Sequence, residues 1–229
     1  MANNNNKLKA YVRYDGTGRV IAGSLILQRF KPQVGNWVEI DANECCNPTT
    51  TTTTTTTTGI PECIGDYDIG QRRDGGTVAY ILQPGDPGYD ASLTQGYIAT
   101  VLDLADAEWG CINVLISGAD GIALGTGNQN TIDIMAGCAT AGIAARLCGD
   151  LVEGGYSDWY LPSKDELNKL YLNRIAIGGF TGTNYWSSTE DDADSAFNQD
   201  FTNGVFGDGD KIAVLSVRPI RSFVCSIVP

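Results

Sequence analysis

The chain has 229 residues, with 15 Lys and Arg against 27 Asp and Glu, no His and seven Cys. The net charge of −12 argues against a primary nucleic-acid binder, because phosphate contacts need clustered Lys and Arg. Without His, the chain cannot by itself build Ser-His or Cys-His nucleophile pairs, His-ligated zinc sites or ordinary haem sites. With 18% charged and 42% hydrophobic residues and 28 Gly, the composition indicates a folded, loop-rich protein.

Membrane and targeting segments are not expected. No apolar run approaches the roughly 18 residues that span a bilayer, so we expect no membrane insertion. Residues 1–7 lack the hydrophobic stretch of a secretory signal, which predicts synthesis in a host cytoplasm and exit by another route, such as lysis. The odd number of cysteines, with Cys45 and Cys46 adjacent, does not resemble a secreted disulfide framework. We therefore expect mostly free thiols, with a single disulfide as the alternative.

Ten threonines at residues 49–58 divide the chain. We interpret them as a spacer; an O-glycosylated stalk and a stem that orders in an oligomer are the alternatives. Residues 1–48, called the head below, carry six basic and four acidic residues. Residues 59–229, called the body, carry nine basic and 23 acidic residues, a net charge of −14 against +2 for the head. This difference suggests two separate roles.

The head is predicted to be a small β unit. Leu8, Ala10, Val12 and Tyr14 alternate with polar neighbours, and residues 15–18 supply turn chemistry. Further short strands are expected at 20–21, 25–27 and 37–40. Fewer than 50 residues make a thin core, so we expect the head to be an anchor stabilised by self-association or by a larger assembly.

The body is predicted to be α+β. Strands are expected at 69–82, 97–104 and 217–223, and helices at 131–152 and from Ser163 onward. Thr131 is the expected N-cap of the first helix, and Ser163 with Glu166 forms a capping box for the second. The buried face of the first helix is expected to carry Ile132, Met135, Cys138, Ile143, Leu147 and Leu151.

A family resemblance rests on five ordered blocks in the body. They are GYSDWYLPSKDELN at 155–168, IGGF at 177–180, YWSSTE at 185–190, FTNG at 201–204 and VRPIRSF at 217–223. Residues 124–131 and 144–148 fit the same pattern. The series resembles the C-terminal domain of Legionella collagen-like (Lcl) adhesins over about residues 65–225.

The resemblance implies a fold like that of C-type lectins and formylglycine-generating enzymes. Such a domain commonly sits at the end of a stalk and binds glycans or host surfaces, often as a trimer. The chain departs from the family in two respects. Binding of sulfated polysaccharides would favour a basic face, whereas the body is acidic, and the calcium-lectin signatures Glu-Pro-Asn and Trp-Asn-Asp are missing.

A second resemblance concerns the head. Residues 9–16 (KAYVRYDG) and 23–27 (GSLIL) look like N-terminal segments of bacteriophage virion proteins of the capsid or fibre. This implies a capsid-decoration, head-fibre or tail-fibre protein on the virion surface. It would bind major capsid or tail proteins through residues 1–48.

The candidate site lies in the polar loop region after residue 189. Polar contacts to a glycan are expected from Glu190, Asn198, Gln199 and Asn203. A calcium ion is one interpretation of the nearby aspartates, although their spacing is not that of an EF-hand, and a solvated acidic loop is favoured. These aspartates are Asp191, Asp192, Asp194, Asp208 and Asp210. No other cofactor is expected.

Other conspicuous residues are interpreted as structural. Trp159 and Trp186 are expected in the core rather than stacked on sugar rings. Arg218 and Arg221 are expected to pair with buried carboxylates near Asp158 or Glu166. No carboxylate spacing or cysteine motif singles out a catalytic group, so we expect no enzymatic activity.

Together these patterns predict a two-part virion protein that displays a lectin-like body for attachment to cell-surface or mucosal glycans. The alternatives are a decoration protein without a ligand and a bacterial surface adhesin located on the cell surface.

Overall fold

The computed structural model describes residues 9–13, 26–28, 37–40, 60–63 and 65–226. The chain divides into two compact units, Met1–Gly59 and Ile60–Pro229. The run of threonines and the pair Cys45 and Cys46 lie outside the described residues. No helix in the described part of the chain is long and apolar enough to cross a membrane.

The first unit contains a three-stranded antiparallel sheet. Its strands are β1 (Lys9–Arg13), β2 (Ile26–Gln28) and β3 (Trp37–Ile40), in the order β2-β1-β3. The predicted small β unit is confirmed at the level of these strands. The alternation over residues 8–14 predicts the strand that forms β1, and the structure places β1 in the centre of the sheet.

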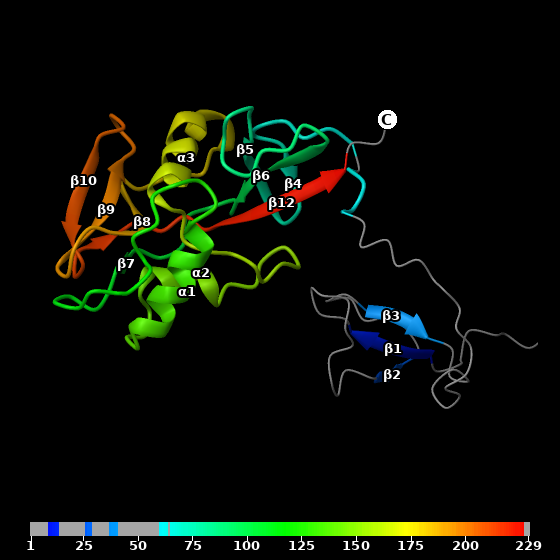
Figure 1. Cartoon of the computed structure of the whole chain (residues 1–229), viewed down its shortest axis with the longest axis horizontal. Coiled ribbons are helices and arrows are strands. Elements are labelled where there is room, and N and C mark those ends of the chain that lie inside the picture. The colour runs from blue at the N-terminus through cyan, green and yellow to red at the C-terminus, as the bar shows by residue number, and fades with distance from the viewer. Residues whose placement is uncertain (1–8, 14–25, 29–36, 41–59, 64, 227–229) are drawn as a thin grey trace, which may run out of the picture. The chain divides into compact units, whose positions relative to one another are not determined.

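The body is α+β, with three antiparallel sheets and three helices (Figure 1). The largest sheet joins β4 (Arg72–Arg73), β5 (Gly76–Ile81), β6 (Leu93–Ala99) and β12 (Ile220–Ser226) in the order β12-β6-β5-β4. A second sheet contains β8 (Asn184–Glu190), β9 (Ser195–Asp200) and β10 (Phe206–Asp210) in the order β10-β9-β8. The short strands β7 (Ala107–Glu108) and β11 (Val214–Leu215) pair with each other.

The helices are α1 (Gly127–Gly137), α2 (Ala144–Gly149) and α3 (Lys164–Ile177). Helix α3 packs on one face of the largest sheet, where Leu167 and Leu170 meet Tyr97. Helices α1 and α2 pack with β8 around a second hydrophobic core. The largest side chains of this core are those of Trp109 and Trp186. Trp159 is also buried, so the structural interpretation of Trp159 and Trp186 is confirmed.

The capping box of α3 is confirmed. The Ser163 hydroxyl accepts a hydrogen bond from the amide of Glu166, and the Glu166 carboxylate accepts one from the amide of Ser163. This motif is local in sequence, so its geometry follows from residues three apart.

The predicted single helix over 131–152 is wrong. Helix α1 begins at Gly127 and ends at Gly137, and α2 begins only at Ala144. Helix α1 ends at Gly137 because its C-cap residue, Cys138, has an extended backbone with φ of −124° and ψ of 110°. Thr131 lies inside α1 and is not its cap. Its hydroxyl donates to the Gly127 carbonyl and accepts from the Leu161 amide. Ile132, expected in the core, is exposed.

The prediction of mostly free thiols is wrong for the body. Disulfides join Cys63 to Cys225 and Cys111 to Cys138, leaving Cys148 as a buried thiol. Burial raises the pKa of the Cys148 thiol well above its usual value. The Cys63–Cys225 pair is separated by 162 residues, so only the fold brings these cysteines together.

The two ends of the body meet at one pole. The Cys63 amide donates to the Ser226 carbonyl at 3.0 Å, and the Ser226 amide donates to the Pro61 carbonyl at 2.8 Å. In Figure 1 the sheet of β8, β9 and β10 lies at the opposite end of the body from this junction. We call these two ends the junction pole and the distal sheet.

Candidate functional site

The distal sheet holds the predicted site residues and has two distinct faces. Phe197 and Gln199 of β9 pair with Asp208 and Phe206 of β10, so these four residues share the face next to α3. On that face the Lys164 ammonium lies 3.6 Å from the centre of the Phe197 ring and 5.1 Å from that of Phe206. The cation therefore bridges two half-buried aromatic rings.

The opposite face is built around Trp186 and Asn198, which are cross-strand partners. A Cβ atom at Gly209 would lie 2.9 Å from the Trp186 ring and 2.8 Å from the Asn198 amide nitrogen. Glycine is therefore required at this position of β10. The close approach leaves Asn198 only 9% exposed.

Three of the four predicted glycan contacts are buried inside the body: Asn198, described above, and also Glu190 and Gln199. Glu190 at the end of β8 is paired with Lys211, and Gln199 has no exposed surface. The Gln199 amide group donates to the Asn168 side chain at 2.9 Å and to the Gly204 carbonyl at 3.0 Å. Neither Glu190 nor Gln199 is presented to a ligand in this arrangement.

Asn203 is exposed but serves the turn between β9 and β10. Its amide group donates to Asp200 at 2.8 Å, and its oxygen accepts from the Val205 amide at 2.8 Å. Glu190 lies at the other end of the sheet, beside the register partner Ala196. The structure therefore does not bring the four predicted residues into one contact surface.

The predicted calcium ligands remain exposed, and Asp192 has a clear local role. Its carboxylate accepts hydrogen bonds from the amides of Asp194 and Ser195 and from the Ser195 hydroxyl. These bonds lower the pKa of Asp192, with the Ser195 hydroxyl as the largest cause. Asp191, Asp194, Asp208 and Asp210 are also exposed. Within the described residues, no group of three or more Asp, Glu or Cys is placed to hold a metal ion.

A buried ammonium group fixes the loops beside the distal sheet. Lys211 has no exposed surface, and its Nζ donates to the carboxylate of Glu190 and to the carbonyls of Val114 and Ala193. The Glu190 carboxylate also accepts from the Ile116 amide at 3.0 Å. Three separate segments of the chain thus converge on one internal ion pair.

The two predicted arginine pairings have different outcomes. Arg221 binds the expected partner, Asp158, through Nε at 2.7 Å and Nη2 at 2.9 Å, but this carboxylate is exposed and not buried as predicted. Arg218 pairs with Asp103 at 2.7 Å, not with Asp158 or Glu166, and also binds the Gly178 and Gly179 carbonyls. Arg218 is fully buried, and burial lowers its pKa.

Glu166 does more than cap α3. Its carboxylate accepts from the Gly125 amide at 2.9 Å and is approached by the Tyr160 hydroxyl at 3.4 Å. Burial raises the pKa of Glu166, while the hydrogen bonds from Ser163 and Gly125 oppose that rise. The Glu166 carboxylate therefore connects the loop before α1 to the start of α3, and its role is structural.

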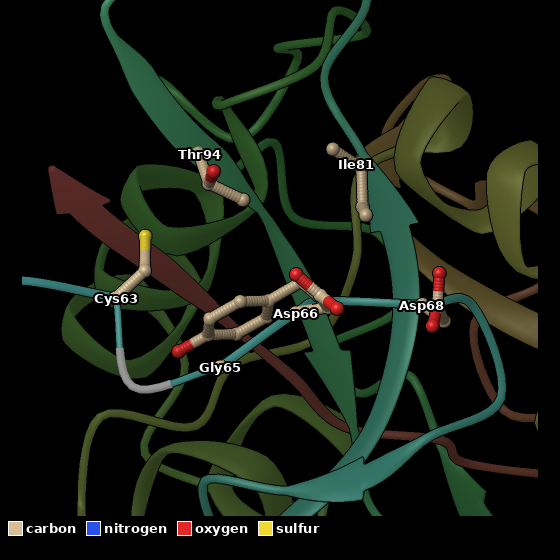
Figure 2. Close-up of a pocket in the computed structure, with 7 residues that line it drawn as sticks. Cys63, Gly65, Asp66, Asp68, Ile81 and Thr94 are labelled. Carbon is tan, nitrogen blue, oxygen red and sulfur yellow. The ribbon is translucent and has the colours of Figure 1, made fainter. Parts of the chain in front are cut away.

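Sequence reasoning missed the cavities at the junction pole. The first has a volume of about 550 Å³ and is drawn in Figure 2. The residues that line it are Cys63, Gly65, Asp66, Tyr67, Asp68, Ile81 and Thr94. A second cavity of about 410 Å³ shares Tyr67 and also borders Cys225, Asp74 and Arg221. No spacing in the sequence joins these residues, since they come from the entry to the body, the large sheet and its C-terminal strand.

Comparisons with known proteins identify no family for this chain. No protein-family model matches the chain, and no curated protein matches it. Among solved structures, a fimbrial protein from Bacteroides ovatus is similar with a TM-score of 0.44 and 14% sequence identity. The matched region covers 65% of this chain and 43% of that chain, so it spans less than half of the fimbrial protein. A similarity of this size does not define a shared fold.

Proposed function

We propose that the protein is a non-enzymatic attachment protein of a bacteriophage virion, in which a lectin-like body is displayed outward from an anchoring head. The head, residues 1–48, would bind a major capsid or tail protein. The body would contact cell-surface or mucosal glycans. The ordered Lcl-like blocks and the resemblance of residues 9–16 and 23–27 to virion proteins motivate this proposal.

The position of the chain entry relative to the distal sheet gives the strongest support for the proposal. The chain enters the body at Ile60–Cys63 beside Ser226, and the distal sheet lies at the far end of the body (Figure 1). A domain held at one pole presents the opposite pole to its surroundings. This polarity suits a display domain whose contact surface is the distal sheet.

The disulfides support an extracellular working environment. Four of the five body cysteines are paired, and such bonds persist where the surroundings are oxidising. A virion surface and a bacterial cell surface both meet this condition. The adhesin alternative is therefore retained, with the same distal contact surface.

Weak single-site binding would suffice if many copies act together. Several copies on one particle raise the effective concentration of each further contact. We propose a homo-oligomer, with a trimer as the favoured form. Calcium remains an optional partner of the exposed aspartates.

The second candidate function is structural decoration without a ligand. The exposed carboxylates of Asp191, Asp192, Asp194, Asp208 and Asp210 favour it. A surface of one charge sign keeps particles apart and in solution. This alternative predicts that no glycan or cell is bound.

Binding of the full chain, displayed in many copies, to a glycan array and to host cells tests the proposal. We expect saturable binding that weakens at least about tenfold in an Asn203→Ala, Asp208→Asn variant. Asp150→Asn, an exposed carboxylate of the body outside the distal sheet, is the matched control and should bind normally. Parallel measurements in calcium and in EDTA decide whether a metal takes part. Absence of binding to every glycan and cell would favour structural decoration.

A further inference from the structure

Within the described part of the chain, few noncovalent contacts hold the entry segment, Ile60–Cys63, to the body. Two backbone hydrogen bonds join it to Ser226, and the Ser226 hydroxyl adds contacts of 3.4 Å to the carbonyls of Ile60 and Pro61. Residues 60–62 are exposed. The Cys63–Cys225 disulfide is therefore the main attachment of this segment.

The two cysteine residues of this disulfide differ in exposure. Cys63 is half-buried and lines the first cavity, where Figure 2 draws it together with Asp66 and Asp68. Cys225 borders the second cavity but is only 3% exposed. Since thiol–disulfide exchange requires access to the attacked sulfur, a small thiol should attack Cys63 from the first cavity.

The charge of the first cavity selects the attacking thiol. Asp66 and Asp68 are both exposed at its wall, and among the described residues that line it there is no Lys or Arg. Arg73 lies over the Tyr67 ring at 3.5 Å, but it borders the second cavity and is paired with Asp74. Two carboxylates near the reaction path repel an anionic thiol and attract a cationic one. The class of reagent that fits is therefore a small thiol that carries an ammonium group.

We propose that the Cys63–Cys225 disulfide is an exchangeable latch, and that the first cavity is the port through which a small cationic thiol opens it. The thiolate of the reagent attacks the Cys63 Sγ, the bond to Cys225 breaks, and Cys225 leaves as a thiolate that takes up a proton from water. A second reagent thiolate then releases Cys63 from the mixed disulfide. Two reagent thiols are oxidised to one disulfide while the protein disulfide is reduced to two thiols.

Opening the latch changes how the body is tethered. The second attachment of the chain lies at Asp66 and Tyr67. The Asp66 carbonyl accepts from the Arg73 guanidinium at 2.5 Å. The Tyr67 ring stacks on Phe223 at 4.4 Å, and the Tyr67 hydroxyl donates to Asp74 at 2.6 Å. Moving the attachment from Cys63 to Asp66 frees three residues, about 10 Å of extended chain at roughly 3.5 Å per residue. The closed latch fixes where the tether leaves the body, and the open latch gives the body more freedom of orientation.

The test compares two thiols on the folded full chain. Cysteamine, a cationic thiol, and 3-mercaptopropionate, an anionic one, are supplied at equal thiolate concentration, and opening is followed by alkylation and mass spectrometry. Because thiolates differ in intrinsic nucleophilicity, the rate compared for each thiol is its rate with the protein divided by its rate with a small neutral disulfide. We expect cysteamine to open Cys63–Cys225 at least about fivefold faster at low ionic strength, with the first adduct on Cys63. The preference should disappear in 0.5 M salt, where the electrostatic screening length is roughly one third or less of its value at low ionic strength. It should also disappear in an Asp66→Asn, Asp68→Asn variant. Asp150→Asn should retain it.

Hydrogen exchange reports the structural consequence. After opening, the Cys63 and Ser226 amides should exchange at least about tenfold faster, while the Ile98 amide in the large sheet should not change. A Cys63→Ser, Cys225→Ser variant should reproduce the fast exchange without any thiol. Equal rates for the two thiols, a first adduct on Cys225, or unchanged protection of the two amides in the open form would each overturn the proposal.

Discussion

Lys211 and Glu190 form an ion pair that is almost completely removed from water, with side chains 0% and 4% exposed. Replacing Lys211 by Met leaves the Glu190 carboxylate buried without its cation. We expect the free energy of unfolding to fall by about 3–5 kcal/mol, the range for breaking a buried pair from one side. Chemical denaturation of the purified full chain measures this change.

The double variant Lys211→Met, Glu190→Gln is the matched control for that prediction. It removes both charges, so it should be less destabilised than Lys211→Met alone. If the single variant lost less than about 1 kcal/mol, the ion pair would not be the group that fixes the three loop segments.

Tyr67 gives a spectroscopic test of the contacts at the junction pole. Burial and the hydrogen bond to Asp74 raise the pKa of Tyr67 to about 12. Because the folded-state pKa is raised, this phenol contributes stability that is fully present below about pH 10 and is lost as the pH rises towards about 12. An absorbance titration at alkaline pH, taken as the difference between the native chain and Tyr67→Phe, should show one phenol titrating near pH 12.

The opposite result would be a transition near pH 10 in that difference titration. It would mean that the Tyr67 hydroxyl is solvated and does not donate to Asp74. The stacked position of Tyr67 on Phe223 would then not be the second attachment of the tether.

At the scale of elements, the start of α3 depends on Ser163. Its hydroxyl accepts from the Glu166 amide and donates to the Ala123 carbonyl at 2.9 Å. Ser163→Ala removes both bonds and leaves the Glu166 amide without its cap, whereas the Ala123 carbonyl still accepts from the Thr126 hydroxyl at 2.7 Å. We expect a loss of about 1–2 kcal/mol in the free energy of unfolding, measured by denaturation.

Ser157→Ala is the control for the cap, since Ser157 is exposed and precedes the strand-like segment before α3. It should change stability by less than about 0.5 kcal/mol. Equal effects of the two substitutions would rule out the capping box as a source of stability.

The elements that could be predicted are those with a local cause. The capping box predicts the start of α3, and alternation predicts the first strand of the head. The strands expected at 69–82, 97–104 and 217–223 overlap β5, β6 and β12, although residues 100–104 belong to no strand.

The helix expected over 131–152 is wrong because the apolar spacing continues past Cys138, whose extended backbone ends α1. The sequence favours a loop where the distal sheet forms, because Asp and Gly in β10 are weak strand formers that are held there by pairing with β9.

At the scale of the whole molecule, long-range contacts decide the site, and the sequence does not encode them in any spacing. The polarity of Glu190 and Gln199 predicts a contact surface, yet each of these side chains is bound to a partner that is distant in the sequence. Lys211 supplies the cation for Glu190, and Asn168 binds Gln199. The Cys63–Cys225 disulfide and the cavities beside it likewise depend on the meeting of the two ends of the body.

The polarity of the body, with its junction at one pole and the distal sheet at the other, is the central claim. It is tested most directly by the adhesion of beads that carry the full chain in a fixed orientation. Beads coupled through the N-terminus leave the distal sheet free, whereas beads coupled through a reactive side chain introduced at position 208 cover it. We expect adhesion to host cells when the chain is coupled through the N-terminus or through position 150, and no adhesion when it is coupled through position 208. Equal adhesion in all three orientations, or adhesion only when position 208 is attached to the bead, would contradict the claim.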